Sequence, residues 1–382
     1  LGLPDIATFD ISGFEHTGLT YETETGLLSG IPTEKGEHPV LFLFKLKTSA
    51  EDSAFHEKKL LLIVNPNPKS LWQDLPSDQT DPYWKPDAAT AAFDIGDRKL
   101  VIASKRGRSH AHEGKFRDDD FDFAFFEESG WGILAVADGA GSAKYARQGS
   151  KIACEAIIEF FREKLTPEQN QEFEAIIQSF NQDRNEENQK KLSRIVIDHL
   201  GKAAHFAHLQ INEEALRNSA VIKDYSTTLE FCLLKKYDFG YFVTSFWVGD
   251  GGIGIYNREK LEVIALGVPD GGEYAGQTRF LTMPDIFANE SFYRRFSIKI
   301  VEAFTAVILM TDGITDPKFQ TDANLLKVEK WNELWDDLGG NNADNVKVSF
   351  DKTNTEIENE LLTWLDFWSA GNHDDRTIAI IY

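Results

Sequence analysis

Residues 133–142 read ILAVADGAGS, and residues 307–316 read VILMTDGITD. Each stretch is a run of apolar residues typical of a buried β-strand, and each run ends at an Asp-Gly pair. Two further aspartates stand in comparable places: Asp250 in FWVGDGG, and Asp374 just before the strand-like RTIAIIY. An isolated aspartate at the end of a strand most often begins a turn. Four of them on separate predicted strands indicate instead that several strand ends meet at one edge of a sheet.

Carboxylates gathered at such an edge repel one another unless a counter-charge is present. Divalent cations with oxygen ligands supply that charge, and the glycine after each aspartate lets the turn come close to an ion. Because neither His nor Cys accompanies these aspartates, we expect a hard ion such as Mg²⁺ or Mn²⁺. The other interpretation, that each aspartate only forms a turn, stays open at this point.

Composition sets the outer limits. The chain has 382 residues, 42% of them hydrophobic, which is enough for two domains with a sizeable core. Its net charge of −22 argues against a nonspecific binder of nucleic acid or of anionic membranes. The two cysteines, Cys154 and Cys232, both lie in apolar runs, so neither a disulfide framework nor a thiolate metal site is expected.

Cysteine usage of this kind suits a reducing compartment, and we expect a cytoplasmic protein. No apolar stretch approaches the roughly 20 residues of a membrane span. The chain begins at Leu1 rather than Met, so we expect a fragment or a processed form, and an upstream targeting segment stays open.

Three regions of the chain differ in composition and in hydrophobic periodicity. Residues 1–66 alternate short β-type runs with Gly/Pro turns, and GLTYETETGLLSGIPT at 18–33 resembles the core of small cadherin- or immunoglobulin-like modules. That resemblance implies a β-sandwich spacer or adhesion unit. Residues 67–94 are rich in Pro, Asp and Ser and are predicted to be a linker. Residues 95–382 mix long β-runs with helical periods, for example at 147–164, which favours an α+β domain.

Residues 98–382 resemble the metal-dependent protein phosphatases (type 2C serine/threonine phosphatases), in particular their bacterial branch. Any one motif of this family is weak evidence, but seven in the family's order are specific. The matching segments are GRSHAHEGKFRDDDF (107–121), VADGAGSAKYARQGS (136–150), YSTTLEFCLL (225–234), FWVGDGGIGIY (246–256), GGEYAGQTRFLT (271–282, the family's flap), VILMTDGITD (307–316) and DDRTIAII (374–381).

The resemblance implies an antiparallel β-sandwich flanked by helix pairs (an αββα arrangement), with a binuclear metal centre at one edge and a third, weaker ion. In that family Asp138 would bridge both ions, and Asp250 would share the third ion with Asp312. The implied catalytic carboxylates are Asp138, Asp312 and Asp374. The implied metal-binding set is Asp118, Asp119, Asp138, Gly139 (through its carbonyl), Asp250, Asp312 and Asp374.

The implied reaction is hydrolysis of phosphoserine and phosphothreonine by water activated between two Mn²⁺ or Mg²⁺ ions, without a covalent phosphoenzyme. The implied partner is a phosphorylated protein, the target of a cognate serine/threonine kinase. The alternative is a pseudophosphatase or phospho-binding regulatory module with low turnover. A structural or adhesion protein dominated by the N-terminal module leaves the ordered aspartates unexplained.

Departures from the family affect substrate contacts more than metal ligands. The family often has an arginine four residues before the first acidic position, and Gly114 stands there. Lys115 or Arg117 is a candidate to bind the substrate phosphate instead, although either is equally interpreted as a surface charge. His110 is a candidate general acid for the leaving alkoxide, against the alternative of an ordinary loop histidine.

Overall fold

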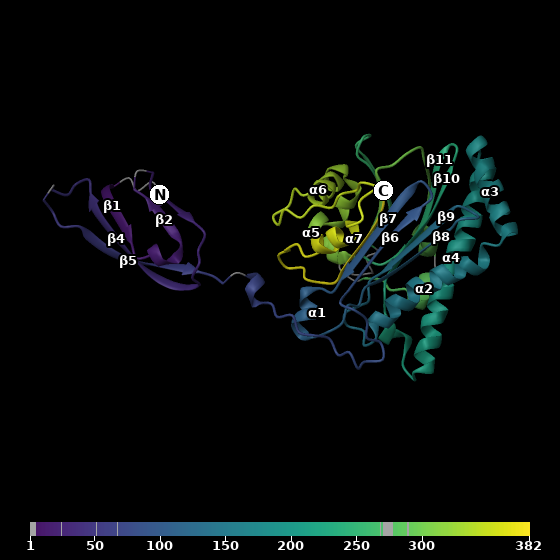
Figure 1. Ribbon diagram of the computed structural model, residues 1–382, viewed down its shortest axis with the longest axis horizontal. Coiled ribbons are helices and arrows are strands. Elements are labelled where there is room, and N and C mark those ends of the chain that lie inside the picture. The colour runs from purple at the N-terminus through teal and green to yellow at the C-terminus, as the bar shows by residue number, and fades with distance from the viewer. Residues whose placement is uncertain are drawn as a thin grey trace. The chain divides into compact units, whose positions relative to one another are not determined.

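The computed structural model describes residues 5–23, 25–50, 52–66, 68–267, 269, 278–288 and 290–382. Residues 270–277, most of the segment that resembles the flap, lie outside the described residues. Contacts divide the chain into two units, Leu1–Gln73 and Asp74–Tyr382. Figure 1 labels their helices and strands.

The N-terminal unit contains β-strands and short 3₁₀ turns in its described residues. Strands β1 (Ile6–Ser12), β4 (Gly36–Leu46) and β5 (His56–Val64) form an antiparallel sheet, and β2 (Leu19–Glu22) pairs with β3 (Leu27–Gly30) as a hairpin. The 3₁₀ turns are η1 (Glu15–Thr17) and η2 (Pro68–Leu71). The predicted all-β character of this module is therefore confirmed.

Two antiparallel sheets form the centre of the second unit. They pack face to face around a core that includes Leu134, Val136, Cys232 and Leu309, so strands such as β15 are apolar on both faces. The five-stranded sheet has the order β14 (Phe296–Val301), β11 (Gly240–Val248), β10 (Leu229–Tyr237), β9 (Trp131–Ala137), β8 (Asp120–Phe126). The six-stranded sheet has the order β13 (Glu262–Gly267), β12 (Gly252–Asn257), β15 (Ala306–Met310), β16 (Arg376–Ile381), β7 (Arg98–Lys105), β6 (Ala88–Ile95).

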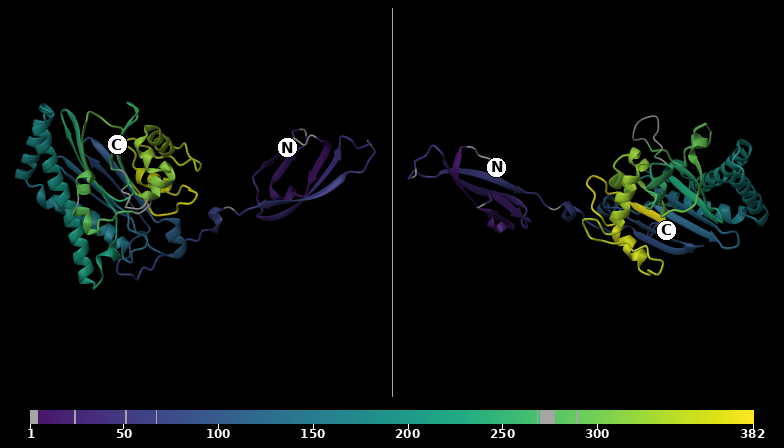
Figure 2. Two further views of the ribbon diagram at one scale, coloured as in Figure 1. Left: turned by 180° about the vertical axis from the view of Figure 1, so that it is seen from behind. Right: turned by 90° about the horizontal axis from the view of Figure 1, so that it is seen from above.

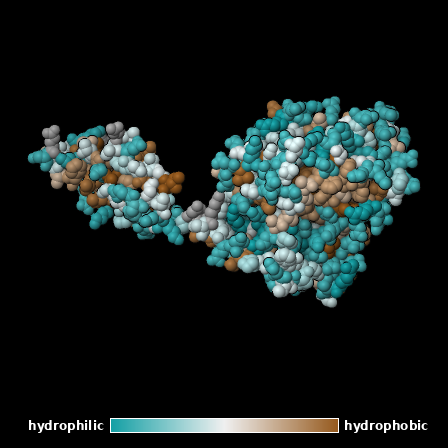
Figure 3. Space-filling view, in the orientation of Figure 1, coloured by the Kyte–Doolittle hydropathy of each residue, from teal (hydrophilic) through white to brown (hydrophobic). Residues whose placement is uncertain are grey.

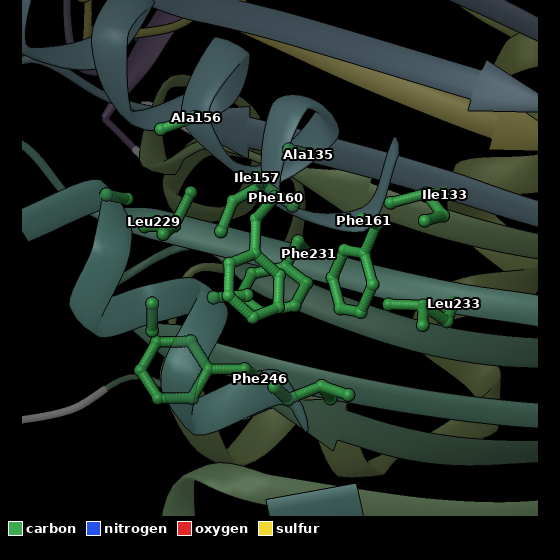
Figure 4. Packing of buried hydrophobic residues seen from close by; sticks show 14 of the residues in the cluster. Ile133, Ala135, Ala156, Ile157, Phe160, Phe161, Leu229, Phe231, Leu233 and Phe246 are labelled. Carbon is green, nitrogen blue, oxygen red and sulfur yellow. The ribbon is translucent and has the colours of Figure 1, made fainter. Parts of the chain in front are cut away.

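Helices cover the outer face of each sheet (Figures 1 and 2). Figure 4 shows Phe160 and Phe161 of α2 facing Phe231 and Phe246 of the five-stranded sheet. Helices α2 (Ala146–Lys164), α3 (Pro167–Gln182) and α4 (Glu186–Arg217) form this layer, and α5 (Asp312–Phe319), α6 (Val328–Leu338) and α7 (Ile357–Trp364) pack on the other sheet. The remaining helical segments are α1 (Arg108–Glu113), η3 (Ile222–Tyr225), η4 (Pro284–Phe287), η5 (Glu290–Arg295) and η6 (Asp322–Leu326). The predicted α+β sandwich of αββα type is confirmed.

The linker prediction for residues 67–94 needs correction. Residues 74–87 belong to the second unit, and β6 begins at Ala88, where it pairs with β7. The backbone N–H of Leu75 donates to the carbonyl of Ala111, and the Arg106 side chain donates to the carbonyl of Leu75. Proline, serine and aspartate do exclude regular structure here, but the buried arginines Arg106, Arg117 and Arg147 elsewhere in the unit donate to this irregular chain and hold it in place.

The surface of the second unit is mostly hydrophilic in the view of Figure 3, as the acidic composition leads one to expect. In the part of the chain that the structure describes, no helix is both long enough and apolar enough to cross a membrane.

Candidate metal centre

Three of the predicted aspartates come together where strands of both sheets end. Asp138 follows β9, Asp250 lies between β11 and β12, and Asp312 follows β15 as the first residue of α5. Each offers a carboxylate oxygen, and these oxygens lie within 4.8 Å of one another. The strand ends predicted from VADG, VGDG and MTDG therefore do converge.

A second group contains His110, Asp374 and Asp375, whose ligand atoms also lie within 4.8 Å of one another. Asp374 acts on the first group through its charge, which contributes to the raised pKa values of both Asp138 and Asp312. The two groups are thus neighbouring parts of one acidic site.

Asp119 lies between these groups and is fully buried. Its Oδ2 accepts hydrogen bonds from the hydroxyls of Thr311 (2.9 Å) and Thr377 (2.7 Å). Its Oδ1 is buried without a hydrogen-bond partner. Burial, followed by the charge of Asp375, raises the pKa of Asp119 to about 7. The same two causes raise the pKa of the neighbouring Asp118 to about 7.

The electrostatics of the site are those of carboxylates without a counter-charge. Burial, and then the charges of neighbouring aspartates, raise the pKa of Asp138 and of Asp312 well above the ordinary range. Asp250 accepts a hydrogen bond from the Thr278 hydroxyl, yet its Oδ1 is buried without a partner. Unpaired buried oxygens on Asp119 and Asp250, in a set rich in carboxylates, fit a hard divalent cation.

Two glycines make this convergence sterically feasible. A Cβ on Gly139 would stand 2.6 Å from the carbonyl oxygen of Asp118, and a Cβ on Gly313 would overlap the carbonyl oxygen of Asp375. Any side chain at either position would push the acidic segments apart. The Asp-Gly pairing seen in the sequence is therefore a packing requirement of the site.

Asp375 has a role that sequence reasoning missed. Its Oδ1 accepts hydrogen bonds from Nδ1 of His110 (3.0 Å) and from the backbone N–H of Gly107 (2.6 Å), and its Oδ2 accepts one from the backbone N–H of Asp118. It thereby fixes His110 and Asp118. The doubled aspartate in HDDRT was the available signal, but only Asp374 was singled out from it.

His110 is buried beside these acids, with Nε2 4.0 Å from both Asp118 Oδ2 and Asp374 Oδ1. Burial alone would lower its pKa, but the hydrogen bond to Asp375 and the surrounding negative charge raise the pKa to about 9. In the metal-free protein the imidazole is therefore protonated at neutral pH.

The prediction that Arg117 binds substrate phosphate needs correction. Its side chain is buried, and the guanidinium donates to the carbonyls of Pro86 (3.1 Å) and Asp119 (2.8 Å) and to the hydroxyl of Ser104 (2.6 Å). These partners hold the guanidinium inside the fold, away from any substrate. Lys115 is exposed and pairs with Glu113 at 2.6 Å.

A groove adjoins the acidic site. Thr278, whose hydroxyl binds Asp250, contributes to its wall, as does Ser226. Phe280, Met283 and Pro284 add apolar surface to the same groove. A peptide segment bound there would lie next to the carboxylates.

Comparison with known proteins supplies the family context. The family model for Protein phosphatase 2C matches residues 106–365, more than half of the chain. The comparison with curated proteins gave no match.

Several solved structures are similar to the chain at low identity. A bacterial serine phosphatase is 14% identical, with a TM-score of 0.43, over 74% of this chain and 96% of that one. The S. agalactiae serine/threonine phosphatase is 12% identical, with a TM-score of 0.41, over 77% and 99%. The catalytic domain of the phosphatase PstP in complex with two manganese ions is 13% identical, with a TM-score of 0.41, over 74% and 97%.

Proposed function

The chain belongs to the protein phosphatase 2C family and is by that membership a phosphoprotein phosphatase, and we propose that it hydrolyses phosphoserine and phosphothreonine with the help of Mn²⁺ or Mg²⁺. The observation that supports this proposal most is the convergence of Asp138, Asp250 and Asp312 within 4.8 Å. A site of this kind needs cations to be stable when its carboxylates are ionised.

The residues proposed to hold the ions are those predicted from the sequence. Asp138, the carbonyl of Gly139, Asp312 and Asp374 would serve a binuclear centre, Asp118 and Asp119 would order its waters, and Asp250 would serve a third ion with Asp312. Two such ions, when bound, activate a water molecule and neutralise the phosphoryl oxygens.

The chain's own groups would do the rest. His110, oriented by Asp375, would carry the proton that the leaving alkoxide of serine or threonine requires. Thr311 and Thr377 would keep Asp119 in one orientation through their hydroxyl hydrogen bonds. Lys115 remains a candidate to contact the phosphate, since its ammonium is exposed and pairs with the surface acid Glu113.

We propose that the substrate is a protein phosphorylated by a cognate serine/threonine kinase. A cytoplasmic setting is supported by two unpaired cysteines, Cys154 and Cys232, both buried. The N-terminal module is proposed to be a separate spacer or adhesion unit, which its division from the second unit by contacts supports.

The first test is hydrolysis of p-nitrophenyl phosphate and of a phosphothreonine peptide with Mn²⁺, with Mg²⁺ and with EDTA. Turnover that requires the metal and disappears in EDTA would support the proposal. Equal turnover in EDTA would overturn the metal-dependent mechanism.

A low-turnover, phospho-binding module remains the second candidate. The observation that favours it is the burial of Arg117, whose guanidinium is held inside the fold. Gly114 stands at the family's phosphate-binding position. The other arginine of the GRSHAHEGKFRDDDF segment, Arg108, donates to the carbonyls of Asp366 and Phe367. Calorimetric Mn²⁺ binding combined with negligible turnover on both substrates would favour this candidate over the enzyme.

A further inference from the structure

Residues 74–87 precede the part of the chain that matches the family, and they belong to the second unit. This segment, called the strap below, is held by side chains from the fold behind it. Arg106 donates to Asp74 Oδ1 (2.7 Å), and Arg147 donates to Asp81 Oδ1 (2.7 Å) and to the carbonyl of Tyr83 (3.2 Å). The strap is therefore a fixed part of the unit.

The strap inserts one lysine beneath the metal centre. Lys85 is buried, and its Nζ donates to the carbonyl of Asp119 (2.7 Å), to Asp120 Oδ2 (2.8 Å) and to the carbonyl of Arg147 (3.3 Å). Burying an ammonium group costs desolvation free energy. The three acceptors offset this cost and fix the position of the Lys85 ammonium.

The carbonyl of Asp119 is held by two cations at once. Arg117 Nη1 donates to it at 2.8 Å, in addition to the Lys85 ammonium at 2.7 Å. The preceding peptide is fixed as well, because the carbonyl of Asp118 accepts the Ser150 hydroxyl and its N–H donates to Asp375. The Asp118–Asp119 backbone is thus held at both residues, with Asp118 Oδ2 4.0 Å from His110 Nε2 and the charge of Asp119 contributing to the raised pKa of Asp138.

We propose that Lys85 is a positioning residue of the metal centre, which acts by holding the Asp119 main chain so that the Asp118 and Asp119 carboxylates converge on the cations. The strap is on this view an essential extension of the catalytic unit that the family match does not cover. The inference rests on the proposed metal centre and concerns cation affinity, with Lys85 touching neither cation nor substrate.

A simpler role for Lys85 would be to neutralise Asp120, whose buried carboxylate it pairs with at 2.8 Å. Two variants separate these roles. Asp120→Asn removes the ion pair but keeps the bond from Lys85 to the Asp119 carbonyl. The double variant Lys85→Met with Asp120→Asn removes the bond and both members of the charge pair, and the Arg117 guanidinium, 4.0 Å from Asp120 Oδ1, loses that carboxylate equally in both variants.

The measurements are the Mn²⁺ dissociation constant by titration calorimetry and the melting temperature in EDTA, on the full chain. Groups that orient metal ligands typically change affinity by 10–100-fold when removed. We expect Asp120→Asn to bind Mn²⁺ within about twofold of wild type and the double variant to bind at least about tenfold more weakly. Lys85→Arg with Asp120→Asn restores a cationic donor and should recover most of the loss.

Lys202→Met is the matched control, because Lys202 is exposed on α4, where its ammonium pairs with Asp198. It should leave the Mn²⁺ affinity unchanged. Wild-type affinity in the double variant, or equal weakening in Asp120→Asn alone, would overturn the role of Lys85. Absence of Mn²⁺ binding by the wild-type protein would instead refute the metal centre itself. If the double variant does not fold, the Asp120→Asn result decides between the two roles.

Discussion

His110 and Asp375 are joined by a 3.0 Å hydrogen bond from the imidazole Nδ1 to the carboxylate Oδ1, although they are 265 positions apart in the sequence. The same carboxylate accepts the backbone N–H groups of Gly107 and Asp118. One side chain therefore sets the position of both the candidate general acid and the acidic pair.

Asp375→Asn should reduce kcat about 10–100-fold at saturating Mn²⁺, because the amide loses the charge that holds His110 and offers only one oxygen acceptor. Steady-state hydrolysis of p-nitrophenyl phosphate measures the effect. Asp366→Asn is the matched control, since Asp366 is a surface acid paired with Lys105. A kcat equal to that of the control would remove the positioning role of Asp375.

Asp138→Asn and Asp312→Asn should each lower turnover by about 10²–10³-fold, since the centre's cations are expected to supply several kcal/mol of transition-state stabilisation. In EDTA the same variants should melt at a higher temperature than wild type, because each removes a partly buried carboxylate whose pKa is raised by desolvation and by its acidic neighbours. Asp198→Asn on α4 should change neither property. A lower melting temperature in EDTA would show that these carboxylates are not strained in the metal-free fold.

Adding Mn²⁺ to metal-free protein should raise the melting temperature of the catalytic unit. At a free concentration 100 times the dissociation constant, one site contributes about 2.7 kcal/mol, or an increase of about 4 °C for a unit of this size. Differential scanning calorimetry follows the transition, with Mn²⁺-free and EDTA-containing samples as references. No upward shift at any Mn²⁺ concentration would contradict a cation site in the folded state.

Glu230→Gln should stabilise the metal-free protein, and more so as pH rises. Glu230 lies at the start of β10 with its Oε2 buried and without a hydrogen-bond partner, and burial, followed by the charge of Asp250, raises its pKa well above 4.5. As pH rises, Glu230 ionises in the unfolded chain before it ionises in the folded protein. The free energy of unfolding of the wild type therefore falls above about pH 4.5, whereas the glutamine of the variant does not titrate.

Melting temperatures of wild type and Glu230→Gln in EDTA at pH 5 and pH 8 measure this effect, and the gap between them should be wider at pH 8. Glu262→Gln, at an exposed position at the start of β13, is the control and should show a constant gap. A gap that stays constant between pH 5 and pH 8 would mean that Glu230 has a normal pKa in the folded protein, and a gap that narrows would mean that its pKa is lowered.

The layered fold and the converging aspartates were accessible from the sequence because their signals are local. The runs ILAVA and VILM report strands buried on both faces, and the following Asp-Gly pairs mark where those strands end. The family's motif order then indicated that the ends meet at one edge.

The partners of those aspartates were not accessible, because they depend on contacts between distant segments. Arg117 is an arginine between a phenylalanine and an aspartate, with nothing local to say that Ser104 and Pro86 enclose it. Likewise, Lys85 lies in a stretch whose Pro and Asp content predicted a linker, and only the folded structure brings it to Asp119. Charge type is visible in a sequence, but the burial of a charge is a property of the tertiary fold.

Strand β16 lies in the interior of its sheet, between β15 and β7, where it pairs Ile381 with Leu100 and Val307 with Ile381. On the ribosome this strand leaves the exit tunnel after every other described strand, and Asp374 and Asp375 emerge just ahead of it. Until then β7 and β15 have no strand between them, and the acidic site lacks one of its sides. A nascent chain therefore has neither a continuous six-stranded sheet nor a complete acidic site until β16 has been synthesised and has inserted between β15 and β7.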